Sequence, residues 1–394
     1  MKSKEYDIII VGAGPAGLAL AEKLASEDFK ILVLDKKKNA KDVQYHTSGS
    51  FINPKEWNLP RSILNPISKC YIISKNKGIV KKGKGVIINR QGLLEFLEKR
   101  AKKNKNLELC YGVVIKEICA TKNRILWIKY LKDKKGFKVS AKIYVDCSGF
   151  GVVLGRKINL NPKYVPAIGV EYLVPLKREP DAIDLILGSN LKGGYGWIFP
   201  LNKNLAIIGY GTLFKDMFPK VESGLKKMWE IKRVKERCEF KPLEKRIGVL
   251  RTGNPPKRLV KNNIILIGDS ALQANPLVGE GIRFVMDSAR IASKWIKVTL
   301  KTKNLKHLKN YEKEWKKKYY KKYKVAFKLQ RLMKKITKSD KLIDLVVRAA
   351  GKVSEKSGMK ILKGDVDYRL VIKIWIKLLK YLFCKSFLRQ IQKS

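Results

Sequence analysis

Short, continuously apolar stretches alternate with helical patterns in the first 300 residues of the chain. Residues 6–12 (YDIIIVG), 30–35 (KILVLD), 141–149 (AKIYVDCSG) and 262–270 (NNIILIGDS) have the pattern of strands buried on both faces. Residues 13–27 lie between the first two stretches and carry apolar side chains at near-helical spacing. A strand, a helix and a second buried strand form a βαβ unit, which predicts a parallel sheet covered by helices.

The remaining patterns divide the chain further. Residues 36–82 show loop signals and short pieces interrupted by prolines, and residues 88–103 read as an amphipathic helix. Residues 107–118 and 124–131 have the pattern of strands in a meander or hairpin. Alternation between residues 163 and 255 indicates a mainly antiparallel sheet with a helix near residues 221–234. From about residue 304 onward, the chain is helical in pattern and rich in lysine.

These elements predict an α/β protein with a Rossmann-type domain. This dinucleotide-binding domain is discontinuous, 1–165 and 255–303, because a buried strand and a glycine-rich turn return after residue 262. Residues 166–254 are expected as an inserted, mainly antiparallel substrate domain, and residues 304–394 as a helical C-terminal region.

A phosphate-binding turn follows the first strand. Gly12, Gly14 and Gly17 fit the GxGxxG pattern between a strand and a helix. The first glycine permits the tight turn, the second lets the backbone approach a pyrophosphate, and the third lets helix and strand pack closely. Asp35 ends the next strand, where a carboxylate bonds ribose hydroxyls and repels a 2′-phosphate. The turn predicts NAD or FAD rather than NADP.

A second glycine-rich turn lies far along the chain. Asp269 follows a buried strand, so its carboxylate is expected at the edge of the sheet where ligands bind. A carboxylate there accepts a bond from a ribityl hydroxyl, which FAD has and NAD lacks. Pro276, Gly279 and Gly281 form a loop into another helix N-terminus, which stabilises the anion of a reduced flavin.

Residues 193–211 (GGYGWIFPLNKNLAIIGYG) place large rings among glycines. Either the rings fill a tight turn and the core, or they line a cavity for an apolar ligand. Alternate positions of a strand face the same side, so Tyr195, Trp197 and Phe199 are expected on one face.

Together these motifs resemble the FAD-dependent geranylgeranyl reductase family, within the aromatic-hydroxylase-like flavoproteins. The resemblance covers about residues 5–300 and rests on GAGPAG, INRQGLLEFL, VDCSGFGVVLGR, GYGWIFP and GDSALQANPLVGEGI. The Tyr-x-Trp-x-Phe-Pro signature at residues 195–200 is the narrowest and is similar to archaeal digeranylgeranylglycerophospholipid reductases. The resemblance implies FAD in the discontinuous domain, and an isoprenoid lipid chain against Tyr195, Trp197 and Phe199.

The resemblance also carries cofactor contacts over to matching positions. Those positions are Ala16, Asp35, His46, Thr47, Gly49, Arg90, Val114, Asp269, Gly281 and Ile282. Arg90 fits chemically as well, because a cation is expected near the pyrophosphate. Many relatives have a cysteine in the stretch that matches residues 45–51, whereas this chain has none there, which puts any chemistry of that thiol in doubt.

The implied reaction is the reduction of trisubstituted alkenes, with hydride from reduced FAD and a proton from an acid. Tyr195, Glu280 and a bound water are the candidate proton donors, and Glu280 is also placed to act as a helix-start carboxylate. NAD(P)H, an acidic ferredoxin or a deazaflavin is the expected electron donor. Three alternatives share the motifs: a monooxygenase of a hydrophobic substrate, a lycopene-cyclase-like isomerase, and a non-enzymatic flavoprotein or lipid carrier.

Charge and cysteine usage add limits. The chain has 86 Lys and Arg against 34 Asp and Glu, a formal net charge of +52, which indicates an anionic partner or a lysine-rich proteome. This excess is spread along the chain without a nucleic-acid-binding motif, so no nucleic acid is expected. Six cysteines without CxxC spacing and an N-terminus without a signal peptide favour a cytoplasmic protein. With only His46 and His307, no metal site is expected.

The C-terminal sequence predicts contact with a membrane surface. As a helix, residues 368–388 gather cations on one side and apolar residues on the other, too charged to span a bilayer. The cationic stripe is Arg369, Lys373, Lys377 and Lys380, and the apolar side includes Trp375, Leu378, Leu379 and Leu382. Such a helix either lies in an anionic membrane interface, on the inner face of the membrane, or packs its apolar side onto the protein.

Overall fold

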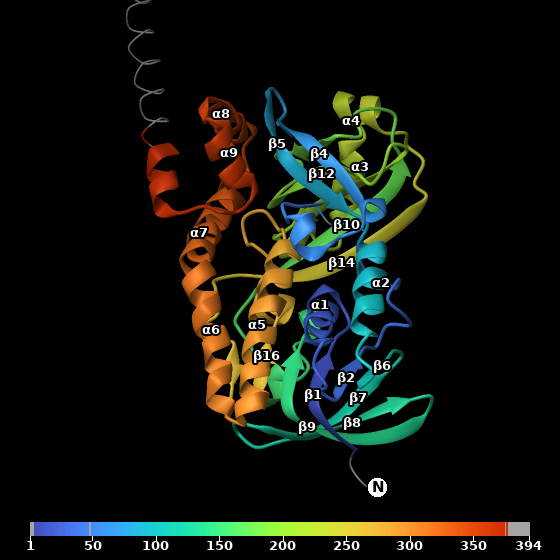
Figure 1. Ribbon diagram of the computed structural model, residues 1–394. Coiled ribbons are helices and arrows are strands. Elements are labelled where there is room, and N and C mark those ends of the chain that lie inside the picture. Colours follow the sequence, from blue (N-terminus) through green and yellow to red (C-terminus); the bar gives the residue numbers. More distant parts are fainter. Residues whose placement is uncertain (1–3, 47–48, 375, 377–394) are drawn as a thin grey trace, which may run out of the picture.

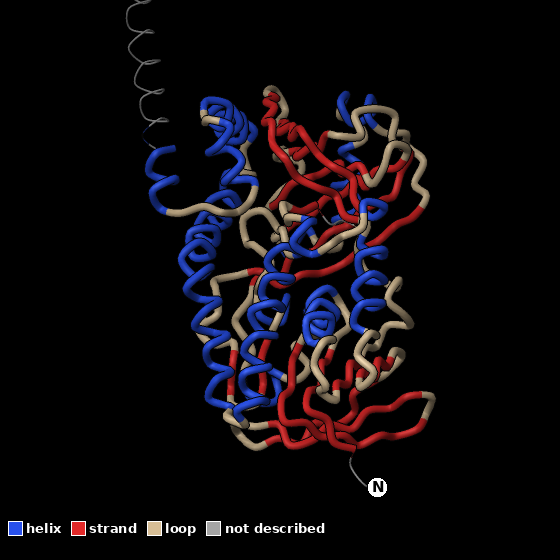
Figure 2. Tube along the Cα trace, in the orientation of Figure 1, coloured by secondary structure: helices blue, strands red, loops and turns tan. Residues whose placement is uncertain are grey.

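The molecule is built on two eight-stranded sheets, one at each end (Figures 1 and 2). The computed structural model describes residues 4–46, 49–374 and 376. Figure 1 shows the first sheet at the lower end, the second sheet at the upper end, and a column of C-terminal helices along one side of both. The predicted fold class is confirmed: a Rossmann-type sheet, a mainly antiparallel sheet and a helical C-terminal region.

The first sheet has a parallel centre built from the predicted buried strands. Strand β1 (Lys4–Val11) pairs in parallel with β2 (Ile31–Leu34) and β9 (Lys135–Asp146), and β16 (Ile264–Leu266) pairs with β9. The parallel edge is β6 (Leu107–Cys110), and the antiparallel additions are β7 (Val114–Ala120), β8 (Ile125–Lys132) and β15 (Val260–Lys261). Strands far apart in sequence, β9 and β16, therefore lie side by side.

Helices α1 (Pro15–Leu24), α2 (Arg90–Ala101) and α5 (Ile282–Thr302) pack against this sheet. Helix α1 contacts both α2 and α5, and its residues are almost all buried. The apolar run of β1 and the apolar side of α1 share one large core cluster with α5. Burial on both faces explains why the parallel strands are continuously apolar rather than alternating.

The second sheet is antiparallel apart from one pair. Its strand order is β14-β10-β13-β12-β11-β4-β5-β3, and only β11 and β4 run parallel. The strands from the predicted insertion are β10 (Val165–Pro175), β11 (Ala182–Ile186), β12 (Gly194–Pro200), β13 (Leu205–Thr212) and β14 (Glu244–Thr252). The other three are β3 (Gly49–Ser50), β4 (Leu64–Ile73) and β5 (Gly78–Ile88).

Strands β4 and β5 correct the expectation of loops and short pieces over residues 36–82. The two strands form a long antiparallel pair whose register shifts between Ile67 and Lys69. Pro66 is accommodated within β4, and charged side chains interrupt the apolar alternation of β5, so neither strand shows a regular period. Residues 49–88 therefore contribute to the same sheet as residues 166–254, although the sequence places them in the first domain.

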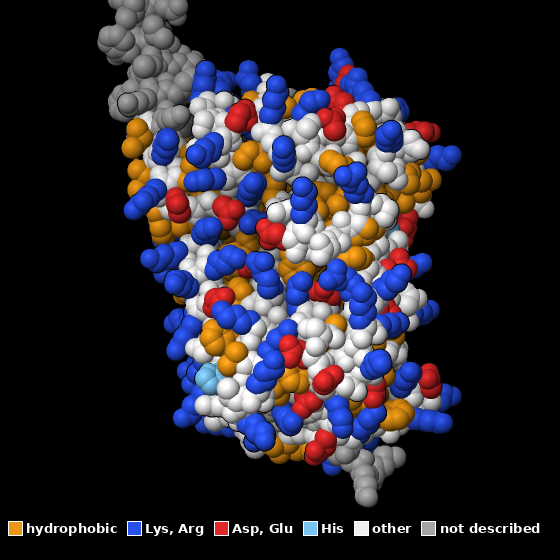
Figure 3. Space-filling view, viewed as in Figure 1, with side chains coloured by type: hydrophobic (Ala, Val, Ile, Leu, Met, Phe, Trp, Pro, Cys, Tyr) orange, Lys and Arg blue, Asp and Glu red, His pale blue; other side chains and the backbone are white. Residues whose placement is uncertain are grey.

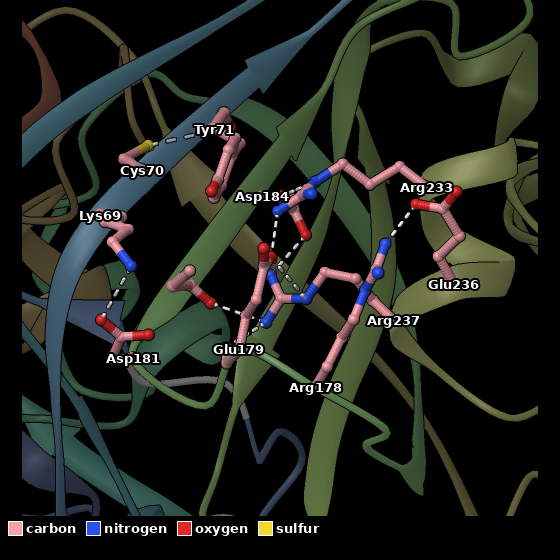
Figure 4. A network of polar contacts seen from close by, with 11 residues as sticks. Lys69, Cys70, Tyr71, Arg178, Glu179, Asp181, Asp184, Arg233, Glu236 and Arg237 are labelled. Atoms are coloured by element: carbon pink, nitrogen blue, oxygen red, sulfur yellow. Dashed lines mark hydrogen bonds and ion pairs between the residues drawn. The ribbon is translucent and has the colours of Figure 1, made fainter.

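Helices α3 (Val221–Met228) and α4 (Lys232–Arg237) cover one face of the second sheet and share a core cluster with it. A network of charged groups anchors α4 (Figure 4). Arg237 is fully buried and its Nη1 lies 2.6 Å from Oδ2 of the equally buried Asp184, on β11. Arg233 pairs with the same carboxylate at 2.8 Å and lies over the ring of Tyr71. The network thus ties α4 to two strands, β11 and β4.

The C-terminal helices form the column at the side of the molecule (Figure 1). They are α6 (Lys309–Trp315), a π-helical turn (Lys316–Tyr320), α7 (Lys321–Ile336), α8 (Asp340–Lys352) and α9 (Glu355–Leu362). Helix α6 packs on α5, while α8 and α9 pack on β5 of the second sheet. Buried Lys81 of β5 donates to the Val353 carbonyl between α8 and α9 at 2.6 Å. The C-terminal region therefore connects the two sheets.

On the face drawn in Figure 3, basic side chains are spread out rather than gathered in one patch. Figure 3 shows Lys and Arg across the whole visible face, with acidic and apolar groups between them. Within residues 4–46, 49–374 and 376, no helix combines the length and the apolar character needed to cross a membrane.

Candidate functional site

The glycine turn after β1 has the geometry that phosphate binding requires. Gly12 has φ +108°, and a Cβ atom there would lie 2.2 Å from the Cys147 carbonyl oxygen. A Cβ at Gly17 would lie 1.8 Å from the Gly12 oxygen, so α1 packs so close to the turn that only glycine fits at this position. At Gly14, by contrast, an added Cβ would meet no described atom within 4 Å. The N-terminus of α1 thus has open space where the backbone can bind an anion.

Asp35 lies beside this turn, as expected for a ribose-binding carboxylate. Its Oδ2 accepts from the Ala13 N–H at 2.5 Å, and its Oδ1 accepts from the Lys37 N–H at 2.9 Å. The Lys37 ammonium donates to the Ala13 carbonyl at 2.7 Å, and burial lowers the pKa of this amine. The carboxylate is therefore fixed at the end of β2, next to the glycine turn.

The two glycine fingerprints, about 250 residues apart in the sequence, touch in the structure. A Cβ at Gly268 would lie 3.1 Å from the Ala16 Cβ in the first turn of α1. Asp269 follows in the same 3₁₀ turn, η6 (Gly268–Ala271), and is half-buried. Burial raises the pKa of Asp269, while the charges of Arg90 and Arg251 lower it. Predicted contacts from both fingerprints thus surround one space.

Arg90 approaches this space from the start of α2. Asn89 caps the helix by accepting from the Gly92 N–H at 3.2 Å. The Arg90 guanidinium lies 5.8 Å from the Tyr45 ring centre, and burial lowers its pKa while the charge of Asp269 raises it. This position agrees with the prediction of a cation near the cofactor.

The segment before β3 contains two of the predicted cofactor contacts, His46 and Thr47, and only His46 is described by the structure. The buried His46 has its Nε2 2.5 Å from Glu244 Oε2, and the Arg246 Nε donates to it at 3.2 Å. The His46 N–H donates to buried Glu171. Its ring is therefore engaged by the start of β14, and a cofactor contact by His46 stays a prediction. Thr47 lies outside the described residues.

Two further predicted positions lie on strands. Gly49 begins β3, and a Cβ there would lie 3.2 Å from the Phe199 ring, so Gly49 packs against the aromatic strand. Val114 begins β7 with an exposed side chain, whereas its buried neighbour Val113 donates its N–H to the Asp35 carbonyl at 3.0 Å. The exposed Val114 side chain forms no wall of the site, and its contact also stays a prediction.

The loop at the start of α5 contacts the aromatic strand directly. Tyr195 donates its hydroxyl to the Val278 carbonyl at 2.7 Å, and burial raises its pKa to about 12. Gly279 has φ +71°, and a Cβ there would lie 3.3 Å from the Tyr195 hydroxyl. Gly281 is the N-terminal cap residue of α5, and Ile282 is its first residue. The predicted flavin loop and the predicted substrate strand are therefore adjacent.

The Glu280 carboxylate lies between β3 and Arg283 in the first turn of α5. Its Oε1 accepts from the Ser50 hydroxyl at 2.7 Å and from the Phe51 N–H at 3.0 Å. Its Oε2 lies 3.5 Å from the Arg283 Nε. Burial raises the pKa of Glu280. These contacts favour a role in the site over that of a helix-start carboxylate, and a raised pKa suits a group that holds a proton.

Tyr195, Trp197 and Phe199 share one face of β12, as predicted. Their rings form a series, with Tyr195 edge-on to Trp197 at 5.9 Å and Trp197 stacked on Phe199 at 6.2 Å. All three are half-buried, whereas Ile198 between them is fully buried in the cluster under α3. The aromatic face is therefore the one turned away from α3 and α4.

Two glycines of residues 193–211, Gly209 and Gly211, are explained by the Trp197 ring. A Cβ at Gly209 would lie 2.3 Å from this indole, and Cβ atoms at Gly211 and Gly169 would lie 3.3 and 3.5 Å from it. In the register, Tyr195, Gly211, Gly169 and Gly248 are neighbours on four successive strands. The indole thus lies over a surface without side chains. Gly209, Gly211 and Gly169 are therefore covered by the Trp197 ring.

Some residues around the site carry no clear signal in the sequence. Tyr45 packs its ring over Gly248, where a Cβ would lie 2.1 Å from the ring, and loop composition gives no hint of this. Asp146 follows a buried strand as Asp269 does, and that signal could have identified it. Its carboxylate accepts from the Leu154 and Gly155 N–H groups at 2.8 and 2.9 Å and so orders the turn after β9.

Some of the buried polar atoms without a hydrogen-bond partner lie around the same space. Among the described residues they include Tyr45 Oη, Trp197 Nε1, and Arg251 Nε and Nη1, whereas Glu280 Oε2 and Arg283 Nε form an ion pair with each other at 3.5 Å. A buried polar atom without a hydrogen bond destabilises the fold unless a ligand or a water molecule supplies the missing partner. Together with the open side of Gly14, they indicate that the residues fit a large polar ligand such as a flavin dinucleotide. The surface hollows of about 410 and 300 Å³ lie elsewhere, on α3–α4 and on α5–α6.

Comparisons with known proteins agree with this geometry. A family model described as an NAD(P)-binding Rossmann-like domain matches residues 10–40. Among curated proteins, digeranylgeranylglycerophospholipid reductase 2 of Methanopyrus kandleri is 27% identical over 309 residues, covering 73% of this chain and 76% of that protein. These findings confirm the resemblance that the motifs predicted.

Solved structures support the fold. A geranylgeranyl bacteriochlorophyll reductase-like protein from Thermoplasma acidophilum has a TM-score of 0.83 at 18% identity, covering 97% of this chain and 99% of that one. A p-nitrophenol 4-monooxygenase from Pseudomonas putida has a TM-score of 0.71 at 15% identity, covering 92% and 97%. The same fold thus occurs in a reductase-like protein and in a monooxygenase.

Proposed function

We propose that this chain is an FAD-dependent reductase that saturates double bonds in isoprenoid chains of membrane-lipid precursors. The contact between Tyr195 and the loop that begins α5 carries the proposal, because it brings the aromatic strand to the predicted flavin loop. The names of the curated relatives support the substrate class, and the reductase-like neighbour supports the architecture.

The cofactor is held between the two glycine turns. The α1 N-terminus at Gly14 and the cation of Arg90 bind the pyrophosphate, and Asp35 binds a ribose. Asp269 would accept from a ribityl hydroxyl, and the N-terminus of α5 at Gly281 and Ile282 would stabilise the anion of a reduced flavin. When bound and reduced, FAD supplies the hydride for the reaction.

The aromatic face of β12 holds the isoprenoid chain. Trp197 and Phe199 offer a large, rigid apolar surface at low entropic cost, and they lie next to the flavin loop through Tyr195. The faces of these rings also stabilise positive charge that develops as an isolated alkene is protonated.

Glu280 is the proposed proton donor. Its raised pKa keeps a proton on the carboxyl group nearer to neutral pH than an ordinary glutamic acid would. Tyr195 holds its own proton against the Val278 carbonyl, and with a pKa of about 12 it is the weaker acid, so we assign it a positioning role.

Lipid access and electron supply complete the proposal. Tyr368, Ile372 and Ile376 expose apolar side chains four residues apart, with exposed Arg369 and Lys373 beside them. This pattern supports docking of the C-terminal segment on an anionic membrane. The remaining residues of the predicted membrane helix, 377–388, and Trp375 lie outside the described residues. The net charge of +52 favours an acidic electron donor such as ferredoxin over NAD(P)H or a deazaflavin.

The test is expression of the chain beside a pathway that makes geranylgeranyl lipids, followed by mass spectrometry of the extracted lipids. We expect a mass increase of two hydrogens for each saturated double bond, and none with Asp269→Ala. Lipids of unchanged mass but altered retention would indicate an isomerase, and a gain of oxygen would indicate a monooxygenase. Either result would contradict the proposal.

A further inference from the structure

Among the residues that the structure describes, two arginines, Arg237 and Arg251, have fully buried side chains, and they differ in how their charge is balanced. Burying a guanidinium is costly unless carboxylates or a ligand complete its hydrogen bonds. The charge of Arg237 is balanced within the protein, because Asp184 lies 2.6 Å away and Glu179 lies 3.6 Å from its Nε, although this Nε forms no hydrogen bond (Figure 4).

Arg251, on β14, has no such partner. Its Nη2 donates to Asn161 Oδ1 at 2.7 Å and to the Pro162 carbonyl at 2.8 Å, and its guanidinium lies 4.2 Å from the Tyr164 ring centre. Its Nε and Nη1 have no hydrogen-bond partner in the described part of the chain, and no carboxylate there lies within 4 Å. Two N–H donors of a buried cation are therefore unused.

The nearby carboxylates do not fill this role. Asp146 is already saturated, since its Oδ1 accepts from Ser148 and Ser270 and its Oδ2 from two backbone N–H groups. Asp269 is close enough for its charge to act on Arg251, but it is held at the ligand edge of the first sheet. The charges of Arg251 and Asp269 thus interact, but the two side chains do not form an ion pair.

The position of Arg251 indicates what completes it. The end of β14 contacts the turn η6, which carries Asp269, and the turn η3 (Gly149–Gly151) after β9. Both turns follow the carboxyl ends of parallel strands, where ligands bind in this type of sheet. Burial raises the pKa of Asp269, and the charges of both Arg90 and Arg251 act against this rise.

We propose that Arg251 is a cofactor-binding residue, whose Nε and Nη1 donate to a negatively polarised oxygen of FAD at the Gly268–Asp269 turn. This inference rests on the proposed binding of FAD and is independent of the lipid substrate. The oxygen belongs either to the pyrophosphate or to a carbonyl of the flavin ring, since both accept charge-assisted bonds from a guanidinium.

The experiment compares Arg251→Met and Arg251→Lys with Arg237→Met, a matched loss of a buried arginine that is already paired. FAD is removed from each purified protein, and FAD and riboflavin are titrated back while flavin fluorescence is followed. Sulfite is then added to each reconstituted protein, because a cation near the ring strengthens the sulfite adduct.

We expect Arg251→Met to bind FAD about 10- to 100-fold more weakly than the native protein, as for a lost charge-assisted bond. A larger loss for FAD than for riboflavin identifies the phosphate oxygens. An equal loss with at least tenfold weaker sulfite affinity identifies the ring. Arg237→Met should change neither the ratio of FAD affinity to riboflavin affinity nor the sulfite affinity, although it lowers the melting temperature.

Arg251→Lys keeps a cation and the packing volume, so it remains informative if the methionine variant fails to fold. The inference is overturned if the folded Arg251 variants match Arg237→Met in FAD affinity, in the FAD-to-riboflavin ratio and in sulfite affinity. Arg251 would then be a structural residue. Failure of the lipid assay with Arg251 behaving as expected would reject the proposed reaction alone.

Discussion

Trp197 shows at the scale of one residue why glycines and large rings occur together in residues 193–211. The indole needs a flat surface, and Gly209, Gly211 and Gly169 provide one because any Cβ there would meet the ring. Two sequence features that look unrelated, an aromatic strand and a glycine-rich neighbouring strand, are thus one packing arrangement.

This arrangement predicts that Trp197→Ala impairs lipid reduction while FAD stays bound, because the indole lies on the substrate face and outside both glycine turns. We expect at least a tenfold loss in lipid turnover and a flavin content equal to that of the native protein. Gly209→Ala tests the same point without removing the ring. Its Cβ would lie 2.3 Å from the indole and must displace it. Unfolding of both variants would instead assign Trp197 to the core.

Glu280 predicts a pH dependence of stability. Its pKa is raised in the folded protein by burial, so between the ordinary value of 4.5 and the raised value the folded state holds a proton that the unfolded state has lost. The free energy of unfolding therefore falls as pH rises through this window. Glu280→Gln removes that contribution, and thermal unfolding from pH 4 to 8 should show a shallower decline. Parallel curves for both proteins would contradict an ionisable, buried Glu280.

At the scale of elements, regular burial decides what can be predicted from sequence. Strands β1, β2, β9 and β16 were predictable because both faces are covered and the apolar runs are continuous. Strands β4 and β5 were not, because one register shift, an internal proline and several lysines remove any period of two. Neither could sequence predict that the C-terminal helices contact the flavin loop. There, Gln330 of α7 donates to the Pro276 carbonyl at 2.6 Å.

The C-terminal segment gives a prediction at this scale. Val366 and Leu370 are buried against Val325, so the start of the segment belongs to the folded protein. We therefore expect that deleting residues 377–394 reduces co-sedimentation with anionic vesicles and leaves FAD bound. Each cation near such a surface contributes roughly 1 kcal/mol, so high salt should weaken binding of the full chain. Equal vesicle binding by the truncated protein would show that the anchor lies elsewhere.

For the whole molecule, the proposed cofactor site lies where the first sheet, the second sheet and the C-terminal helices meet. A ligand that binds only the folded state stabilises it by mass action, about 2.7 kcal/mol at one hundred times its dissociation constant. We expect FAD removal to lower the melting temperature by several degrees. Adding the same FAD concentration should raise the melting temperature of the Asp269→Ala apoprotein by less than that of the native apoprotein. Without FAD, the two apoproteins should have the same melting temperature. A melting temperature independent of FAD would contradict the site.

The order of strands also has a consequence for how the chain folds while the ribosome synthesises it. The first sheet starts with β1 but needs β16 beside β9, and the second sheet starts with β3 but needs β14. The last strands of the first sheet, β15 and β16, follow β14, the last strand of the second, so a nascent chain that ends before Glu244 exposes unfinished edges of both sheets. Contacts between such distant segments fold slowly. This protein should therefore depend on its synthesis rate and on chaperones more than a protein whose two domains follow one another along the chain.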